Sequence, residues 1–256
     1  MKKLLVSSTT LLLAMAIQSP AQNLGLAPFQ SFAPMGAARA DKPELVLAPI
    51  QRTFVPQGFD DNDNAQVIVT GAYPNSCYHV GHTQYWIDRQ AKKIDIEVTT
   101  YKTNNEFCLQ VYVPFQQEIS VGVLDKGDYT VTVNQDNRNA RPMVVRDSPT
   151  VTPDSHIYAP VSQIIRTGPR EFMLRGTFHS SCLNMESVKL NYEAGEVIAV
   201  LPMATYDSNC FETGQAHAWE SRFRVRNELA GDFLMHVRSL NGDSLNTVQS
   251  FSPFDF

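Results

Sequence analysis

The chain has 256 residues, of which 43% are hydrophobic and 18% are charged, and its formal net charge is −5. An acidic chain without a Lys/Arg cluster lacks the basic patch that phosphate backbones require, so a nucleic-acid partner is not expected. The length suits two domains of about 100 residues, each able to bury a core of ordinary size.

The first residues are typical of a secretory signal peptide. Lys2 and Lys3 precede an apolar stretch, Leu4 to Ile17, that is too short to span a bilayer as a stable helix. Ser19-Pro20-Ala21 places small residues at the positions that a signal peptidase reads. We therefore expect cleavage after Ala21.

The rest of the chain indicates an exported protein. Residues 22–42 are rich in Ala, Pro, Gly and Gln and are expected to form a flexible linker. No later segment approaches 18 consecutive apolar residues, so no membrane span is expected. Loss of Lys2 and Lys3 leaves 19 basic and 26 acidic residues. These features predict a periplasmic or secreted location.

Beyond the linker, apolar residues recur at every second position, as in strands with one buried face. Turn residues separate these runs at intervals of about 8 to 12 residues, which predicts about seven short strands in each half of the chain. The runs in the first half are Val67 and Val69; Ile94, Ile96 and Val98; Leu109, Val111 and Val113; Ile119, Val121 and Val123; and Tyr129, Val131 and Val133. The pattern predicts an all-β chain built from antiparallel β-sandwiches.

One phrase occurs twice and indicates a duplication. "GAYPNSC" at 71–77 matches "GTFHSSC" at 176–182, an offset of 105 residues. A second block, 127–133, matches 231–237 at an offset of 104 residues. Two matching blocks at nearly one offset favour two copies of one domain.

The duplication predicts the domain boundaries. We expect β-sandwich domains at residues 43–147 and 156–256, separated by the linker 148–155, "SPTVTPDS". Its two prolines favour a short, extended and stiff connection, which would leave two bodies with limited freedom.

Four cysteines in an exported chain predict two disulfides, because the compartment is oxidising. Cys77 and Cys108 lie in the first copy and Cys182 and Cys210 in the second, 31 and 28 positions apart. Four cysteines allow three connectivities, and the duplication favours one bridge within each copy.

The arrangement resembles the tandem immunoglobulin-like and fibronectin-type-III-like sandwiches of exported bacterial proteins. The phrases "PQGFDDNDN" and "GAYPNSCY" are similar to those of exported, largely uncharacterised bacterial proteins. The resemblance implies two Ig-like domains and brings no activity with it.

Two groups of side chains are candidates for metal binding. Asp60, Asp61 and Asp63 offer oxygen ligands for calcium, although the loop lacks the Gly and Glu of an EF-hand and Asx-rich turns also form without an ion. His79 and His82 have a spacing that suits zinc on a helix, whereas residues three apart on a strand face opposite sides. A surface turn and a surface loop are the simpler interpretations, so no metal is assigned.

No catalytic motif or free-cysteine nucleophile is found, so no catalytic residue and no cofactor are assigned. Aromatic residues of the first copy offer a sugar-stacking platform, but we expect most of them to fill the core. They are Tyr85, Trp86, Tyr101, Phe107, Tyr112 and Phe115. Alternation predicts that at most one of Tyr85 and Trp86 is exposed.

The sequence therefore predicts a non-enzymatic, exported structural or binding module whose partner, a protein or a glycan, is unknown. The alternative within binding proteins is a secreted adhesin or inhibitor that grips its target through loops at one end of a sandwich. Such a protein should show an apolar or aromatic patch at the loop end, whereas an enzyme should show a pocket with convergent polar groups.

Overall fold

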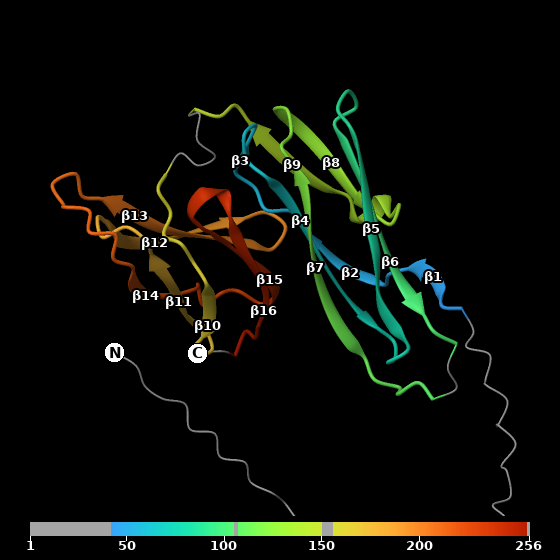
Figure 1. The fold of residues 1–256 in the computed structure, drawn as a ribbon. Coiled ribbons are helices and arrows are strands. Elements are labelled where there is room, and N and C mark those ends of the chain that lie inside the picture. Colours follow the sequence, from blue (N-terminus) through green and yellow to red (C-terminus); the bar gives the residue numbers. More distant parts are fainter. Residues whose placement is uncertain (1–41, 105–106, 150–155, 255–256) are drawn as a thin grey trace, which may run out of the picture. The chain divides into compact units, whose positions relative to one another are not determined.

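The structure is a computed structural model that describes residues 42–104, 107–149 and 156–254. The expected signal peptide, residues 22–41 and most of the linker 148–155 lie outside the described residues. Figure 1 shows the strands in chain order, from β1 in blue to β16 in red.

The first copy is a β-sandwich of two sheets. One has six strands in the order β1-β6-β8-β9-β3, with β5 paired to β6, and the other has three in the order β2-β4-β7. The bounds are β1 Glu44–Leu47, β2 Ile50–Phe54, β3 Phe59–Asp60, β4 Ala65–Tyr73, β5 Tyr78–Asp88, β6 Lys93–Lys102, β7 Val113–Gly122, β8 Gly127–Val133 and β9 Arg141–Arg146. Alternate residues of the facing strands, including Val67, Ile96, Ile119 and Val131, fill the core between the sheets.

The second copy repeats this plan with seven strands. Its sheets have the orders β12-β13-β15-β16 and β10-β11-β14. The bounds are β10 Gln163–Arg166, β11 Glu171–Phe178, β12 Leu183–Glu193, β13 Val197–Tyr206, β14 His217–Arg224, β15 Gly231–Arg238 and β16 Ser244–Phe251. The core contains Phe172, Phe178, Ile198, Trp219 and Val237.

The sheets are not purely antiparallel as predicted, because both copies contain a parallel pair in the same place. β6 pairs with β8 in parallel, and β13 pairs with β15 in parallel. In each case one intervening strand, β7 or β14, lies in the opposite sheet, so the chain returns in its original direction. In immunoglobulin sheets strand C lies next to strand F. Here the place next to β8 is taken by β6, and the place next to β15 is taken by β13.

The glycine of the repeated phrase serves one purpose in both copies. Gly71 lies opposite Phe115 across the β4–β7 pair, and Gly176 lies opposite Trp219 across the β11–β14 pair. A Cβ atom on Gly71 would lie 2.1 Å from the carbonyl oxygen of Pro49, and one on Gly176 would lie 1.7 Å from that of Pro160. Glycine is therefore required where the segment that leads into β2 or β10 passes closely over β4 or β11.

An apolar contact joins the two sandwiches. Phe54 on β2 and Ile68 on β4 pack with Val197 on β13 and Leu234 on β15 in one buried cluster. β4 is thus covered on both faces around Ile68, which explains the continuous apolar run of residues 67–69.

Several buried polar groups at this contact are paired. Arg238 on β15 forms an ion pair with Asp63 at 3.4 Å, and its guanidinium donates to the carbonyl oxygen of Gly58 at 2.8 Å. Gln66 Oε1 accepts hydrogen bonds from Ser244 and Asn246. Residues 41–256 form one compact unit. The boundaries at 43–147 and 156–256 stay a prediction.

Candidate functional site

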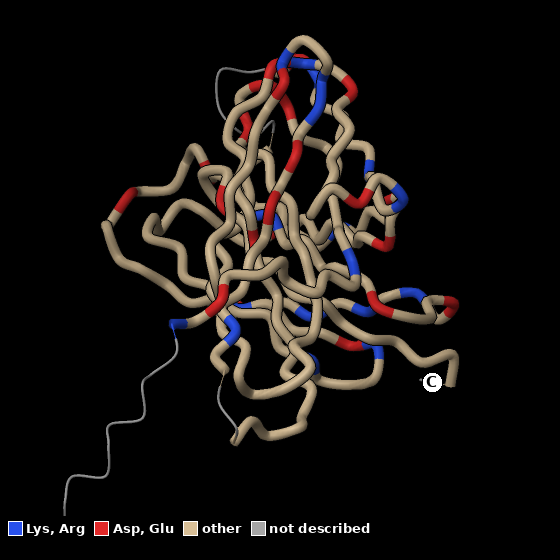
Figure 2. The backbone as a smooth tube through the Cα atoms, turned by 90° about the vertical axis from the view of Figure 1, so that its right-hand side faces the viewer, with Lys and Arg blue, Asp and Glu red and all other residues tan. Residues whose placement is uncertain are grey.

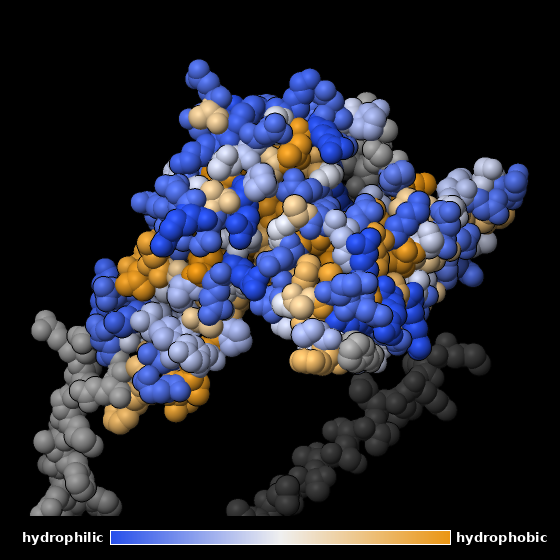
Figure 3. Space-filling view, turned by 180° about the vertical axis from the view of Figure 1, so that it is seen from behind, coloured by the Kyte–Doolittle hydropathy of each residue, from blue (hydrophilic) through white to orange (hydrophobic). Residues whose placement is uncertain are grey.

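The candidate site is the described part of the first disulfide loop, residues 107–112, which precedes β7. Four of its apolar side chains are exposed: Phe107 by 86%, Leu109 by 67%, Val111 by 50% and Tyr112 by 81%. Hydrophobic residues also gather in patches on the molecular surface in Figure 3, seen from behind. Four such side chains in one short loop are more than the scattered apolar residues of an ordinary surface.

The loop is not the strand that the spacing of Leu109, Val111 and Val113 predicted. The β4–β7 ladder ends at the pair Tyr73–Val113, because Pro74 turns the chain away after β4. Residues 109–112 have no strand partner beyond that point, so they lie in an irregular loop with their side chains outward.

The backbone of this loop is fixed although its side chains are exposed. The Cys77–Cys108 disulfide joins it to the start of β5. The amide of Leu109 donates to the hydroxyl of Ser76 at 2.9 Å, and the amide of Ser76 donates to the carbonyl oxygen of Leu109 at 3.0 Å. The amide of Thr103 donates to the carbonyl oxygen of Cys77 at 2.9 Å. The repeated Ser-Cys pair therefore anchors the loop.

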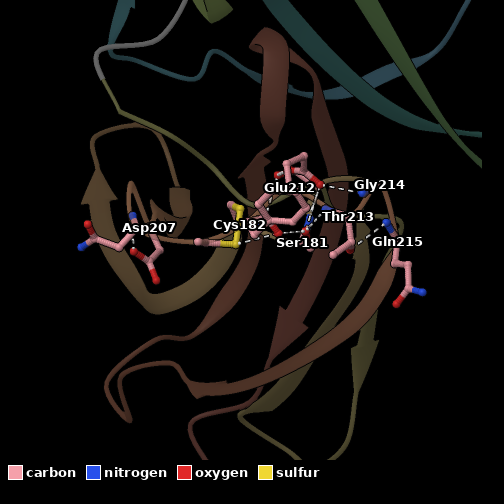
Figure 4. Close-up of a disulfide and its surroundings, with 11 residues drawn as sticks. Ser181, Cys182, Asp207, Glu212, Thr213, Gly214 and Gln215 are labelled. Carbon is pink, nitrogen blue, oxygen red and sulfur yellow. Dashed lines mark hydrogen bonds between the residues drawn. A yellow bond between two sulfur atoms is a disulfide. The ribbon is translucent and has the colours of Figure 1, made fainter.

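The second disulfide loop, residues 207–216, is anchored in the same way. Cys182 and Cys210 form its disulfide, and the hydroxyl of Ser181 accepts from the amide of Thr213 at 2.9 Å (Figure 4). Both predicted disulfides are thus present within the copies. The loop exposes one large apolar side chain, Phe211, by 86%.

Glu212 organises the second loop through its carboxylate. The carboxylate accepts from the hydroxyl of Ser180, from the amide and hydroxyl of Ser181, and from the amide of Gly214 (Figure 4). These hydrogen bonds, led by that of Ser180, lower the pKa of Glu212 to about 2. The second loop is therefore a polar turn around a carboxylate, whereas the first is mainly apolar.

The three aspartates considered for calcium serve other purposes. Asp63 accepts from the amide of Asp60 at 3.0 Å and pairs with Arg238. Asp61 accepts from the amide of Ser148 at 2.9 Å. Burial, followed by the nearby charge of Asp63, raises the pKa of Asp60. Within residues 42–104, 107–149 and 156–254, no three Asp, Glu, His or Cys side chains are grouped to hold a metal ion.

His79 and His82 are both exposed on β5, where a bulge interrupts the pairing between Val80 and Thr83. His82 Nε2 lies 2.5 Å from the Tyr101 hydroxyl oxygen. This contact gives His82 an ordinary surface partner.

The expectation that the aromatic residues fill the core is wrong for most of them. Tyr85 is 42% exposed and Trp86 is 54% exposed, so the alternation rule also fails here. β5 is paired only with β6 among the described strands, and Tyr85 lies at the open edge of the sandwich. Neither face of β5 is therefore fully covered.

In the described part of the chain, no helix is long and apolar enough to cross a membrane. Residues 67–141 match the family model of the ORF11 beta-sandwich domain, well under half of the chain. No curated protein and no solved structure matches the chain. The matched region, similar to that β-sandwich domain, contains the whole first disulfide loop.

Proposed function

We propose that the protein is an exported, non-enzymatic binding module that grips a protein partner through the first disulfide loop. The observation that carries this proposal is the exposure of Phe107, Leu109, Val111 and Tyr112 on a backbone held by a disulfide and by Ser76. The export rests on the signal-like residues 1–21 and on the cysteine content.

The physical argument concerns the free energy of binding. Burial of a Phe or Leu side chain against a partner contributes roughly 1.5 to 3 kcal/mol, so four neighbouring apolar residues provide the centre of an interface. An anchored loop loses less conformational entropy on binding than a free one, which favours affinity. The absence of charged residues among 107–112 agrees with the depletion of charge at interface cores.

A protein suits this loop better than a glycan does. Phe107 is joined by two aliphatic side chains, Leu109 and Val111, whereas a sugar needs several hydrogen-bonding groups beside its aromatic platform. The loop thus favours the alternative of an adhesin or inhibitor over a purely structural role. Ig-like tandem architecture and a location outside the cytoplasm are parts of this proposal.

A capture experiment tests the proposal. The mature protein is immobilised and exposed to the extracellular or periplasmic fraction of producing cells, and retained proteins are identified by mass spectrometry. The same capture is done with the double variant Leu109→Gln and Tyr112→Ser. We expect a partner that the wild type retains and the variant loses.

Val123→Thr is the matched control, because Val123 is an apolar residue exposed by 53% outside the loop. Its capture should equal that of the wild type. Equal retention of the partner by the loop variant, with unchanged circular dichroism, would show that the loop is not the binding surface.

A further inference from the structure

A recess lies on the outer face of the six-stranded sheet, on the opposite side of that sheet from the core. It has a volume of about 410 Å³ and is lined by Trp86, Lys93, Asp95, Glu97, Gln135 and Asn137. Trp86 on β5 is in register with Asp95 on β6, which is in register with Thr132 on β8. These three residues form a row across the sheet, with the indole exposed by 54%.

One wall of the recess comes from the turn after β8. Asn134 and Gln135 both have left-handed backbone conformations, with φ of 51° and 61°. Such conformations are unusual for residues other than glycine and are enriched at functional sites. Asn134 fixes the turn, since its side chain accepts from the amide of Val98 and donates to the carbonyl oxygen of Ala48. The turn places Gln135 and Asn137 beside Trp86.

The recess combines a fixed carboxylate with polar groups that remain available. Asp95 accepts from the Thr132 hydroxyl and lies 2.9 Å from Lys93 Nζ. Burial alone would raise the pKa of Asp95, but the hydrogen bonds from Thr132 and Lys93 outweigh burial and lower it. Glu97, Gln135 and Asn137 make no side-chain hydrogen bond to any residue that the structure describes.

We propose that this recess binds a neutral sugar ring of an oligosaccharide. The C–H face of a pyranose packs on an indole, and its hydroxyl groups need acceptors and donors around that contact. Asp95 and Glu97 supply acceptors, and the amides of Gln135 and Asn137 supply both. Asp95 is the oriented group, because Thr132 and Lys93 hold it in place.

Charge favours a neutral sugar over an acidic one. Two carboxylates and one lysine line the recess, so its formal charge is negative. Figure 2 shows this side of the molecule, with acidic residues on its strands. A sugar that carries a carboxylate or sulfate would be repelled by Asp95 and Glu97.

The recess is separate from the first disulfide loop. It lies on strands β5 and β6 and the turn after β8, and no loop residue lines it. The sugar site therefore does not depend on the protein-binding proposal.

Intrinsic fluorescence provides the test, because the chain has two tryptophans and only Trp86 is exposed. Trp219 is buried and donates to the carbonyl oxygen of Pro160. The mature protein is titrated with cellohexaose, with N-acetylchitohexaose and, as an acidic probe, with hexagalacturonate. We expect a saturable change in emission with at least one neutral oligosaccharide and none with hexagalacturonate.

Variants show whether the signal comes from the recess. Their affinities are measured by calorimetry, because Trp86→Ala lacks the fluorophore. Trp86→Ala should weaken binding at least tenfold, and Glu97→Gln should weaken it severalfold. Tyr85→Ala is the matched control, since Tyr85 is the neighbouring exposed aromatic residue on the opposite face of β5. The Tyr85→Ala protein should bind the oligosaccharide with the affinity of the wild type. No response to either neutral oligosaccharide at millimolar concentration, or equal affinity of Trp86→Ala, would overturn the proposal.

Discussion

Replacement of the glycine in the second copy of the repeated phrase tests why that phrase recurs. In Gly176→Ala, the new Cβ would lie 1.7 Å from the carbonyl oxygen of Pro160 and 2.7 Å from Trp219 Nε1. Neither distance is compatible with van der Waals contact, so the segment around Pro160, just before β10, has to move. That movement would break the 3.1 Å hydrogen bond from Trp219 Nε1 to the Pro160 carbonyl oxygen.

The magnitude follows from these two effects. Overpacking of a well-packed site costs roughly 1 to 3 kcal/mol, and buried polar groups that lose their partner cost about 1 to 3 kcal/mol. We therefore expect Gly176→Ala to lower the free energy of unfolding by about 3 to 5 kcal/mol. Gly71→Ala should have a smaller effect of about 2 to 3 kcal/mol, because its opposite residue, Phe115, has no hydrogen bond to lose.

Urea unfolding followed by circular dichroism and tryptophan fluorescence measures both effects. Gly168→Ala is the matched control, because its Cβ would meet nothing closer than 3.4 Å and its φ is not left-handed. That control should change stability by less than about 0.5 kcal/mol. A Gly176→Ala protein as stable as the control would refute the close-approach explanation of the repeat.

Four further predictions concern stability, acidity and processing. Replacement of Cys77 and Cys108 by Ala should lower the free energy of unfolding by about 3.7 kcal/mol for a separation of 31 residues, as measured in urea. His236 has a pKa lowered to about 4, mainly by burial, so its contribution to stability is present above pH 6.5 and is lost as pH falls towards 4. Between pH 7 and pH 5, the free energy of unfolding of the wild type should fall by about 2 kcal/mol more than that of His236→Gln, as measured in paired unfolding curves. The depressed pKa of Glu212 predicts that the amides of Ser181 and Gly214 exchange faster as pH falls from 4.5 towards 2, after correction for intrinsic rates, and that Glu212→Gln removes this dependence in amide-exchange NMR. N-terminal sequencing of the exported protein should begin at Gln22, and a mature form that retains residues 1–21 would contradict the signal peptide.

Local patterns predicted much of the fold. The period-2 runs around Ile94 and Val131 became buried strands, and the duplicated phrase correctly indicated the pairing of both disulfides. These features depend on neighbouring residues or on an internal comparison, which is why the sequence alone reveals them.

Contacts between distant segments could not be predicted in the same way. The cluster of Phe54, Ile68, Val197 and Leu234 joins strands from both copies, and its only sequence signal was the continuous apolar runs at 67–69 and 197–200. The parallel β6–β8 pair depends on which sheet β7 joins, and alternation does not encode that choice.

The candidate site was missed for a related reason. Leu109, Val111 and Val113 alternate like a strand, but a strand also needs a partner, and β4 ends at Tyr73. The useful signal was the disulfide itself, because Cys108 ties the residues that follow it to Cys77. An apolar segment anchored by a bridge, without a ladder partner, leaves its side chains available for binding.

Site-specific photo-crosslinking tests the central claim most directly. A photoreactive phenylalanine analogue replaces Tyr112 in the first disulfide loop or, as a control, Val123 outside it, in cells that produce the protein. The proposed function predicts a discrete protein adduct from position 112 after irradiation and none from position 123. Absence of an adduct at position 112, or the same adduct from both positions, would contradict recognition through the first disulfide loop.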